Sequence, residues 1–129
     1  MLTADEIARA KTSVRYSLPE GHHEHDDCIR IAHEWLDAQK KLKSPRKTGA
    51  RPLKHLIEKW GGRYVSQTDV EVAAHLHADV VGTYPYYNIS SRLTEPAQDR
   101  LQGIGEAHSQ GYHDRHEAKS YANREDSLP

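Results

Sequence analysis

The 129-residue chain contains no phenylalanine, one methionine and one cysteine, and its only tryptophans are Trp35 and Trp60. The single cysteine, Cys28, excludes a disulfide within the chain. A small protein without disulfides is typical of a reducing compartment, so we expect a cytoplasmic location. Only 36% of the residues are hydrophobic, so the core must be small and must use both tryptophans.

Long hydrophobic runs are also absent, as are the patterns of common active sites. No stretch approaches the roughly 18 apolar residues that a membrane span needs, and the polar N-terminal segment lacks the apolar core of a signal peptide. The chain has no glycine-rich phosphate loop and no nucleophile elbow. We therefore expect a protein that is not an enzyme, needs no cofactor and has no membrane partner.

The chain does have an uneven distribution of charge, with basic residues gathered in one segment. Residues 40–63 include nine basic residues and one acidic residue, for a formal charge of +8, while the whole chain carries −1. A basic band inside an otherwise acidic protein attracts polyanions locally. The same band is also compatible with a solvated surface, or with contact to an acidic protein.

Hydrophobic periodicity predicts a mainly α fold. Thr3 followed by Glu6 is a capping box, which predicts a helix over residues 4–11. A second helix is expected over residues 25–41, because its apolar residues fall on one half of a helical wheel. These are Cys28, Ile29, Ile31, Ala32, Trp35, Leu36 and Ala38. On its other face, opposite charges four residues apart predict the ion pairs Asp26–Arg30, Arg30–Glu34 and Asp37–Lys41.

Two further helices are expected after the loop over residues 43–51. Pro52 suits the first position of a helix, and Leu53, Leu56, Ile57 and Trp60 form its core stripe. Gly61 and Gly62 end it. Ser66 or Thr68 would cap the next helix, over residues 69–76.

The segment from 77 to 93 completes a recognisable order of elements. After a connection over residues 77–87, Asn88 would cap a short helix over residues 89–93. The three helices 53–60, 69–76 and 89–93 resemble the core of a winged helix-turn-helix, and Asn-Ile-Ser-Ser-Arg-Leu is similar to recognition helices of that family. The resemblance implies that residues 89–93 lie in the major groove of DNA and read base edges.

This resemblance and the basic band define the candidate binding residues. Those expected to bind nucleic acid or another anion are Lys43, Arg46, Lys47, Arg51, Lys54, Arg63, Ser90, Ser91 and Arg92. The basic side chains would neutralise phosphates, and the last three would face bases. Tyr84, Tyr86 and Tyr87 would stack on bases or on a small nucleotide, or would pack beneath the connection instead.

A histidine-rich turn is a second candidate site. His22, His23, His25 and Asp27 are residue types that bind zinc. The alternative is a polar first turn in which Asp26 and Asp27 complement the helix dipole. We expect no metal to be needed for folding.

Few apolar residues follow Ile104, so residues 108–129 are expected to be a flexible tail, disordered or ordered by a partner, beside a compact domain over residues 1–107.

The fold prediction is a small single domain, mainly α, with a helix-turn-helix-like core. The functional prediction is a small nucleic-acid-binding regulator encoded by a phage or mobile element. The alternative is an interaction protein that inhibits an acidic protein partner or sequesters a small anionic nucleotide. A homodimer is an open alternative.

Overall fold

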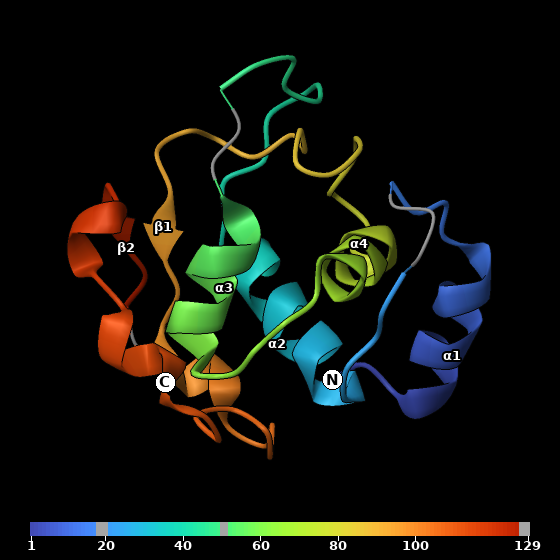
Figure 1. Ribbon diagram of the computed structural model, residues 1–129. Coiled ribbons are helices and arrows are strands. Elements are labelled where there is room, and N and C mark those ends of the chain that lie inside the picture. Colours follow the sequence, from blue (N-terminus) through green and yellow to red (C-terminus); the bar gives the residue numbers. More distant parts are fainter. Residues whose placement is uncertain (18–20, 50–51, 127–129) are drawn as a thin grey trace.

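The computed structural model describes residues 1–17, 21–49 and 52–126. Within these residues the chain is a small, mainly helical single domain with one hydrophobic core. Its α-helices are α1 (Ala4–Ser13), α2 (Asp26–Asp37), α3 (Leu53–Gly61) and α4 (Gln67–Leu76). The later elements are β1 (Thr94–Glu95), the 3-10 helices η1 (Gln98–Leu101), η2 (Gly111–Arg115) and η3 (Ala118–Ser120), and β2 (Asn123–Arg124). The mainly α prediction is confirmed, and Figure 1 shows α2 between α3 and α4.

Both tryptophans are fully buried, as predicted, and α2 supplies much of the core around them. The Trp35 indole N–H donates to the Tyr121 hydroxyl, and the Trp60 indole N–H donates to the carbonyl of Pro96. Satisfying both indole groups allows two large aromatic side chains to be buried without the desolvation cost of an unpaired donor. The predicted face of α2 is confirmed, except that Ala38 lies just beyond the helix and is half-buried.

The predicted extent and ion pairs of α2 differ from the structure. The helix ends at Asp37, because residues 40–42 are extended and pair with residues 88–90. The i,i+4 pairs do not form, since other charges, from within the helix or from elsewhere in the fold, lie closer. Asp26 pairs with Lys11, Arg30 pairs with Asp27, and Glu34 and Asp37 both pair with Arg100.

The predicted boundaries of the other helices are largely confirmed. Thr3 and Glu6 form the capping box of α1, and Ser66 forms one with Asp69 at α4. Pro52 is the N-cap of α3 and not its first residue, and Gly62, at a φ of +68°, ends that helix in the left-handed conformation.

The short helix expected over residues 89–93 does not form. Ile89 makes an antiparallel bridge to Lys41, and the residues after it are extended or bent. Asn88 does not cap a helix. Its side chain accepts from the N–H of Val81 and donates to the carbonyls of Leu42 and Asp79. The helix-turn-helix core is therefore not confirmed.

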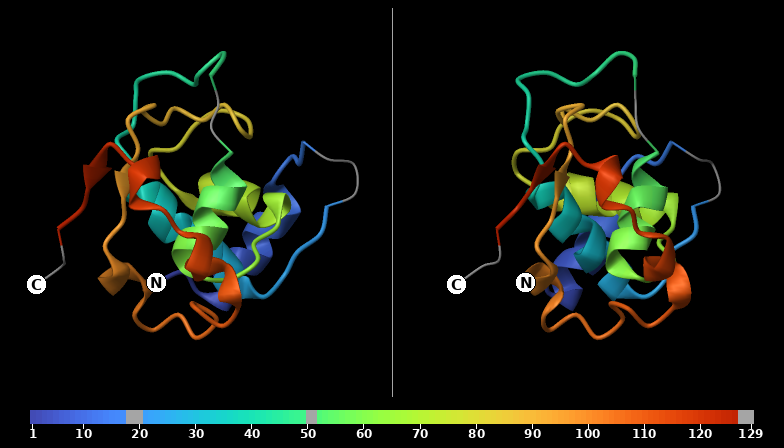
Figure 2. Two further views of the ribbon diagram at one scale, coloured as in Figure 1. Left: turned by 60° about the vertical axis from the view of Figure 1, so that its left-hand side comes forward. Right: turned by 90° about the vertical axis from the view of Figure 1, so that its left-hand side faces the viewer.

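Residues 108–126 lie on the core and do not extend from it as a tail. β2 pairs in parallel with β1, Tyr121 packs against the core, and the ring N–H of His113 donates to the carbonyl of Lys59 in α3. Glu125 binds Arg100 and the N–H of Ala97. The attachment is mostly polar, so the scarcity of apolar residues did not reveal it. Both views in Figure 2 show this segment along one side of the helices.

No helix among the described residues is both long and apolar enough to span a bilayer.

Candidate nucleic-acid interface

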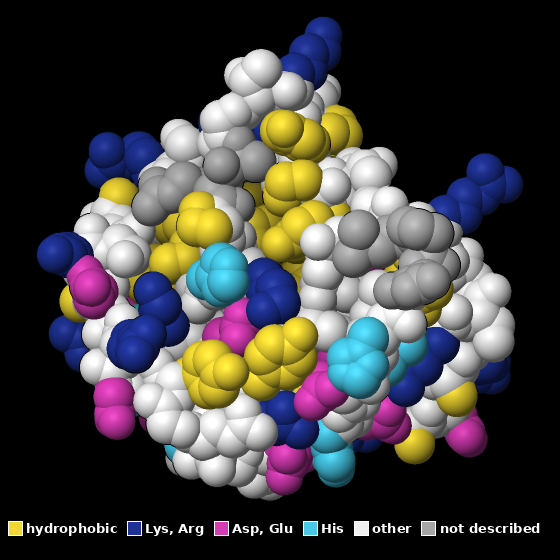
Figure 3. All heavy atoms as spheres, viewed as in Figure 1, with side chains coloured by type: hydrophobic (Ala, Val, Ile, Leu, Met, Phe, Trp, Pro, Cys, Tyr) yellow, Lys and Arg dark blue, Asp and Glu magenta, His cyan; other side chains and the backbone are white. Residues whose placement is uncertain are grey.

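The basic loop, defined here as Lys43–Gly49, projects from the helical body in every view (Figures 1 and 2). Lys43 and Lys47 are exposed and Arg46 is half-exposed. Among the described residues, no carboxylate forms an ion pair with any of these three. Their charges are thus available to an external anion, and Figure 3 shows a basic side chain extending from the top of the projection.

Residues 40–42, which directly precede the basic loop, pair with residues 88–90 through extended backbone and not through a helix pair. The N–H of Ser90 donates to the carbonyl of Lys40 at 2.9 Å, and the N–H of Leu42 donates to the carbonyl of Asn88. The exposed Arg92 therefore lies two residues after a segment that is paired with the residues just before the loop. Ser91 is also exposed and Ser90 is half-buried, and the Ser90 hydroxyl accepts from the N–H of Arg92.

Two of the predicted basic residues are already used within the fold. Arg63 is only 8% exposed and pairs with Glu24 and Glu106. Lys54 pairs with Glu58 at 2.7 Å and lies over the ring of Tyr64. Neither is positioned as a free phosphate contact. Arg51 lies outside the described residues.

The three predicted stacking residues separate into two environments. Tyr86 is 42% exposed and lies on the connection that passes close to the basic loop, where a side chain at Gly82 would meet Pro45. Tyr87 is buried and its ring meets that of Tyr84 edge-on at 6.1 Å. Burial raises the pKa of both Tyr84 and Tyr87, so their hydroxyls stay protonated.

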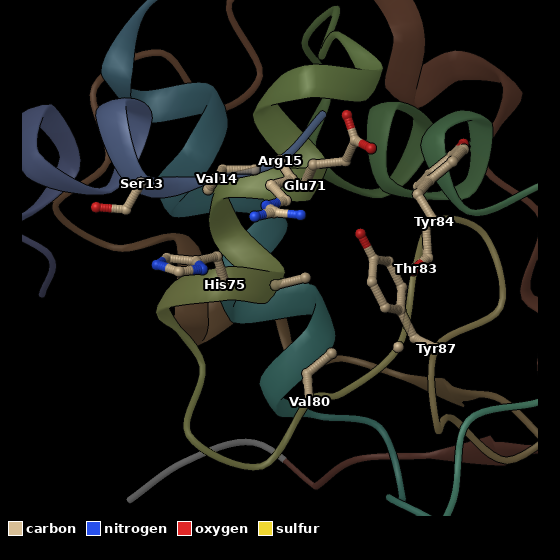
Figure 4. A pocket seen from close by; sticks show the side chains of 11 residues that line it. Ser13, Val14, Arg15, Glu71, His75, Val80, Thr83, Tyr84 and Tyr87 are labelled. Atoms are coloured by element: carbon tan, nitrogen blue, oxygen red, sulfur yellow. The ribbon is translucent and has the colours of Figure 1, made fainter. Parts of the chain in front are cut away.

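Tyr84 and Tyr87 line a cavity of about 450 Å³ between α4, the end of α1 and the 80–87 connection. Figure 4 shows the Arg15 guanidinium and the Tyr87 hydroxyl pointing toward one space, with the Glu71 carboxylate above it on the side of Tyr84. Glu71 and Arg15 were not among the sequence-predicted site residues. The available signal was Glu71 itself, a lone acid in the apolar run Val-Glu-Val-Ala-Ala of α4.

The side chains of His23 and His25 in the histidine-rich turn form hydrogen bonds to other residues of the protein. His23 bridges the Tyr16 hydroxyl and the carboxylate of Asp69, which is fully buried. His25 is the N-cap of α2 and accepts from the N–H of Asp27. Within the described part of the chain, no three His, Cys, Asp or Glu side chains are placed to hold a metal ion together.

No family model, curated protein or solved structure matches this chain significantly.

Proposed function

We propose that this protein binds single-stranded nucleic acid through the basic loop, Arg92 and Tyr86. The observation that carries the proposal is the projecting loop, whose basic side chains have no acidic partner among the described residues. Cationic side chains release counterions from a nucleic acid when they neutralise its phosphates, which provides affinity without sequence recognition.

A single strand fits this surface better than a duplex. Residues 89–93 are not helical, so the interface has no helix in this segment to place in a major groove. Tyr86 offers an exposed aromatic face beside the basic loop, and alternating cationic and aromatic contacts are how proteins bind single strands without strong sequence preference.

A charge-matched pair of variants tests the proposal. In the loop variant, Lys43, Arg46 and Lys47 are each replaced by glutamine. In the control, Arg115, Lys119 and Arg124 are replaced by glutamine, because these three are exposed residues of the C-terminal segment. Binding of a fluorescent single-stranded oligonucleotide of mixed sequence should weaken at least tenfold in the loop variant and little in the control. Equal weakening in both would mean that only net charge matters and would contradict a defined interface.

An interaction protein is the second candidate, because exposed apolar side chains lie beside the same loop. Leu42 is 38% exposed and Val81 is 45% exposed, and both are tied to Asn88. Figure 3 shows hydrophobic side chains gathered below the projecting loop. Apolar patches of this kind mark protein-binding surfaces. Replacing Leu42 and Val81 by serine should leave oligonucleotide binding intact if they serve a protein partner.

A further inference from the structure

The cavity beneath Tyr84 and Tyr87 contains an unpaired buried carboxylate. Glu71 is only 5% exposed; its Oε1 accepts from the N–H of Ser17 at 2.9 Å, and its Oε2 has no hydrogen-bond partner. It is the one buried side-chain oxygen or nitrogen without a partner found in the described chain. An unsatisfied buried polar atom carries a desolvation cost, and more so when it is charged. Glu71 also lines the cavity, so a ligand can supply the missing donor once the side chains that cover Oε2 shift.

The rest of the lining restricts the kind of ligand. Tyr84 and Tyr87 provide aromatic surface, and Arg15 provides an exposed cation at the rim. The volume, about 450 Å³, is in the range of small-molecule sites. A matching ligand combines a flat ring, N–H donors at one end and an anionic group at the other. A nucleotide has these three parts.

The carboxylate also discriminates among the bases. Guanine presents two adjacent N–H donors, N1–H and the 2-amino group, with no acceptor between them. Adenine and cytosine each place a ring acceptor beside their amino group, and uracil flanks its single N–H with two carbonyls. A carboxylate only accepts hydrogen bonds, and charge-assisted bonds of this kind are about twice as strong as neutral ones. Guanine is therefore the best complement to Glu71.

We propose that this cavity binds a guanine base, with the N–H edge on Glu71, the ring against Tyr84 and Tyr87, and the phosphate toward Arg15. The base would come from a free guanine nucleotide or from an unpaired guanosine of a nucleic-acid strand. The Oε2 atom is covered in the structure, so entry of the base requires a shift of side chains around it. The site is separate from the phosphate contacts of the basic loop, and the inference does not depend on the proposed function.

Calorimetric titration with GMP, IMP, AMP, CMP and UMP tests the proposal. IMP is the matched control, because it differs from GMP only by lacking the 2-amino group. GMP should bind 10- to 100-fold more tightly than each of the other four, since each lacks one or both donors. Binding of all five with equal affinity, or of none, would overturn the proposal.

Two variants test whether the preference for GMP over IMP arises in this cavity. Glu71→Gln should reduce the affinity for GMP at least tenfold and remove its advantage over IMP. Arg15→Gln changes an exposed side chain, so the variant should fold normally. It should weaken the binding of GMP, which carries a phosphate, and leave the binding of guanosine unchanged. A Glu71→Gln protein that unfolds with the wild-type midpoint yet keeps the full preference for GMP would contradict the assignment.

Further probes separate this proposal from its competitors. Agmatine, a small guanidinium compound, should not bind; agmatine binding without GMP binding would mean that Glu71 serves an organic cation. Replacing one guanosine by inosine in a single-stranded oligonucleotide should weaken binding if the base comes from a strand, and should have no effect if it comes from a free nucleotide. Salt-dependent binding of oligonucleotides without GMP binding would overturn this inference and leave the proposed function standing.

Discussion

At the scale of single residues, the hydrophobic period of the sequence predicts which side chains are buried. It does not predict the hydrogen-bond partners of those side chains. The wheel over α2 correctly buries Trp35 and Cys28, because side chains on one helical face share one environment. It could not reveal that the hydroxyl receiving the Trp35 N–H belongs to Tyr121, 86 positions away. The unpaired oxygen of Glu71 is likewise a property of the folded cavity.

The Trp35–Tyr121 bond leads to a prediction of stability. Tyr121→Phe keeps the ring but leaves the buried indole N–H without its acceptor, so it should cost roughly 1–3 kcal/mol of unfolding free energy. Trp35→Ala also removes the largest side chain of α2 from the core and should cost roughly 3–5 kcal/mol. Urea unfolding followed by circular dichroism measures both. A Tyr121→Phe protein as stable as wild type would show that the C-terminal segment does not anchor the core in this way.

Cys28 should be unreactive in the folded protein. It is fully buried, its thiol lies 3.3 Å from the carbonyl of Tyr64, and burial raises its pKa to about 12. Because the thiolate is the reactive species, alkylation by iodoacetamide at pH 8 should be slower by orders of magnitude in buffer than in urea. Rapid labelling without denaturant would contradict this burial.

At the scale of elements, helices with a clear apolar period and caps were predictable, whereas the short segment 88–93 was not. Asn88 is a good N-cap by residue type, but the same amide can satisfy loop backbone instead. Here it bonds three backbone groups of two other segments. The pairing of residues 40–42 with 88–90 also shortens α2, and neither effect has a local sequence signal.

Asn88 is expected to position the candidate interface. Asn88→Ala removes three hydrogen bonds, so it should destabilise the protein by roughly 3 kcal/mol at about 1 kcal/mol each. The variant should also weaken oligonucleotide binding, because Asn88 ties Leu42, the residue before the basic loop, to the segment that contains Arg92. Asn123→Ala, at an exposed position in β2, is the control and should change neither quantity by much. Unchanged unfolding of the Asn88 variant would mean that these bonds are not formed in solution.

At the scale of the whole molecule, summed charge predicted a basic region but not how much of it reaches the surface. Folding uses Lys54 and Arg63 in internal ion pairs, whereas the described basic side chains of the loop have no acidic partner. The C-terminal segment was missed because polar contacts, aromatic contacts and a two-residue strand attach it. Apolar content alone therefore underestimates how much of this chain can be ordered.

The histidines predict a dependence of global stability on pH. Burial lowers the pKa of His33 and of His108, with further lowering from His77 for the former and from His113 and His116 for the latter. The fold thus favours the neutral rings, and the unfolded chain takes up protons first, near pH 6.5. The unfolding free energy should be steady above about pH 7 and fall as the pH drops through 6.5 toward 5.5.

Urea unfolding at several pH values between 8 and 5.5 checks this dependence. That range stays above the usual titration of Glu24, Asp37 and Glu125, whose pKa values are lowered in the fold, so their stabilisation is lost only at more acidic pH. A His108→Gln variant should show a smaller decline between pH 7 and 5.5. Constant or rising stability over this range would contradict the account of these two histidines.

The measurement that tests the central claim most directly is the salt dependence of binding to a single-stranded oligonucleotide of mixed sequence. If Lys43, Arg46, Lys47 and Arg92 each neutralise one phosphate, the logarithm of the affinity should fall linearly with the logarithm of salt concentration, with a slope of roughly −3. A duplex of the same length should bind more weakly at every salt concentration. Failure to bind any single strand at low salt would contradict the proposed function, and so would a binding affinity that does not change with salt.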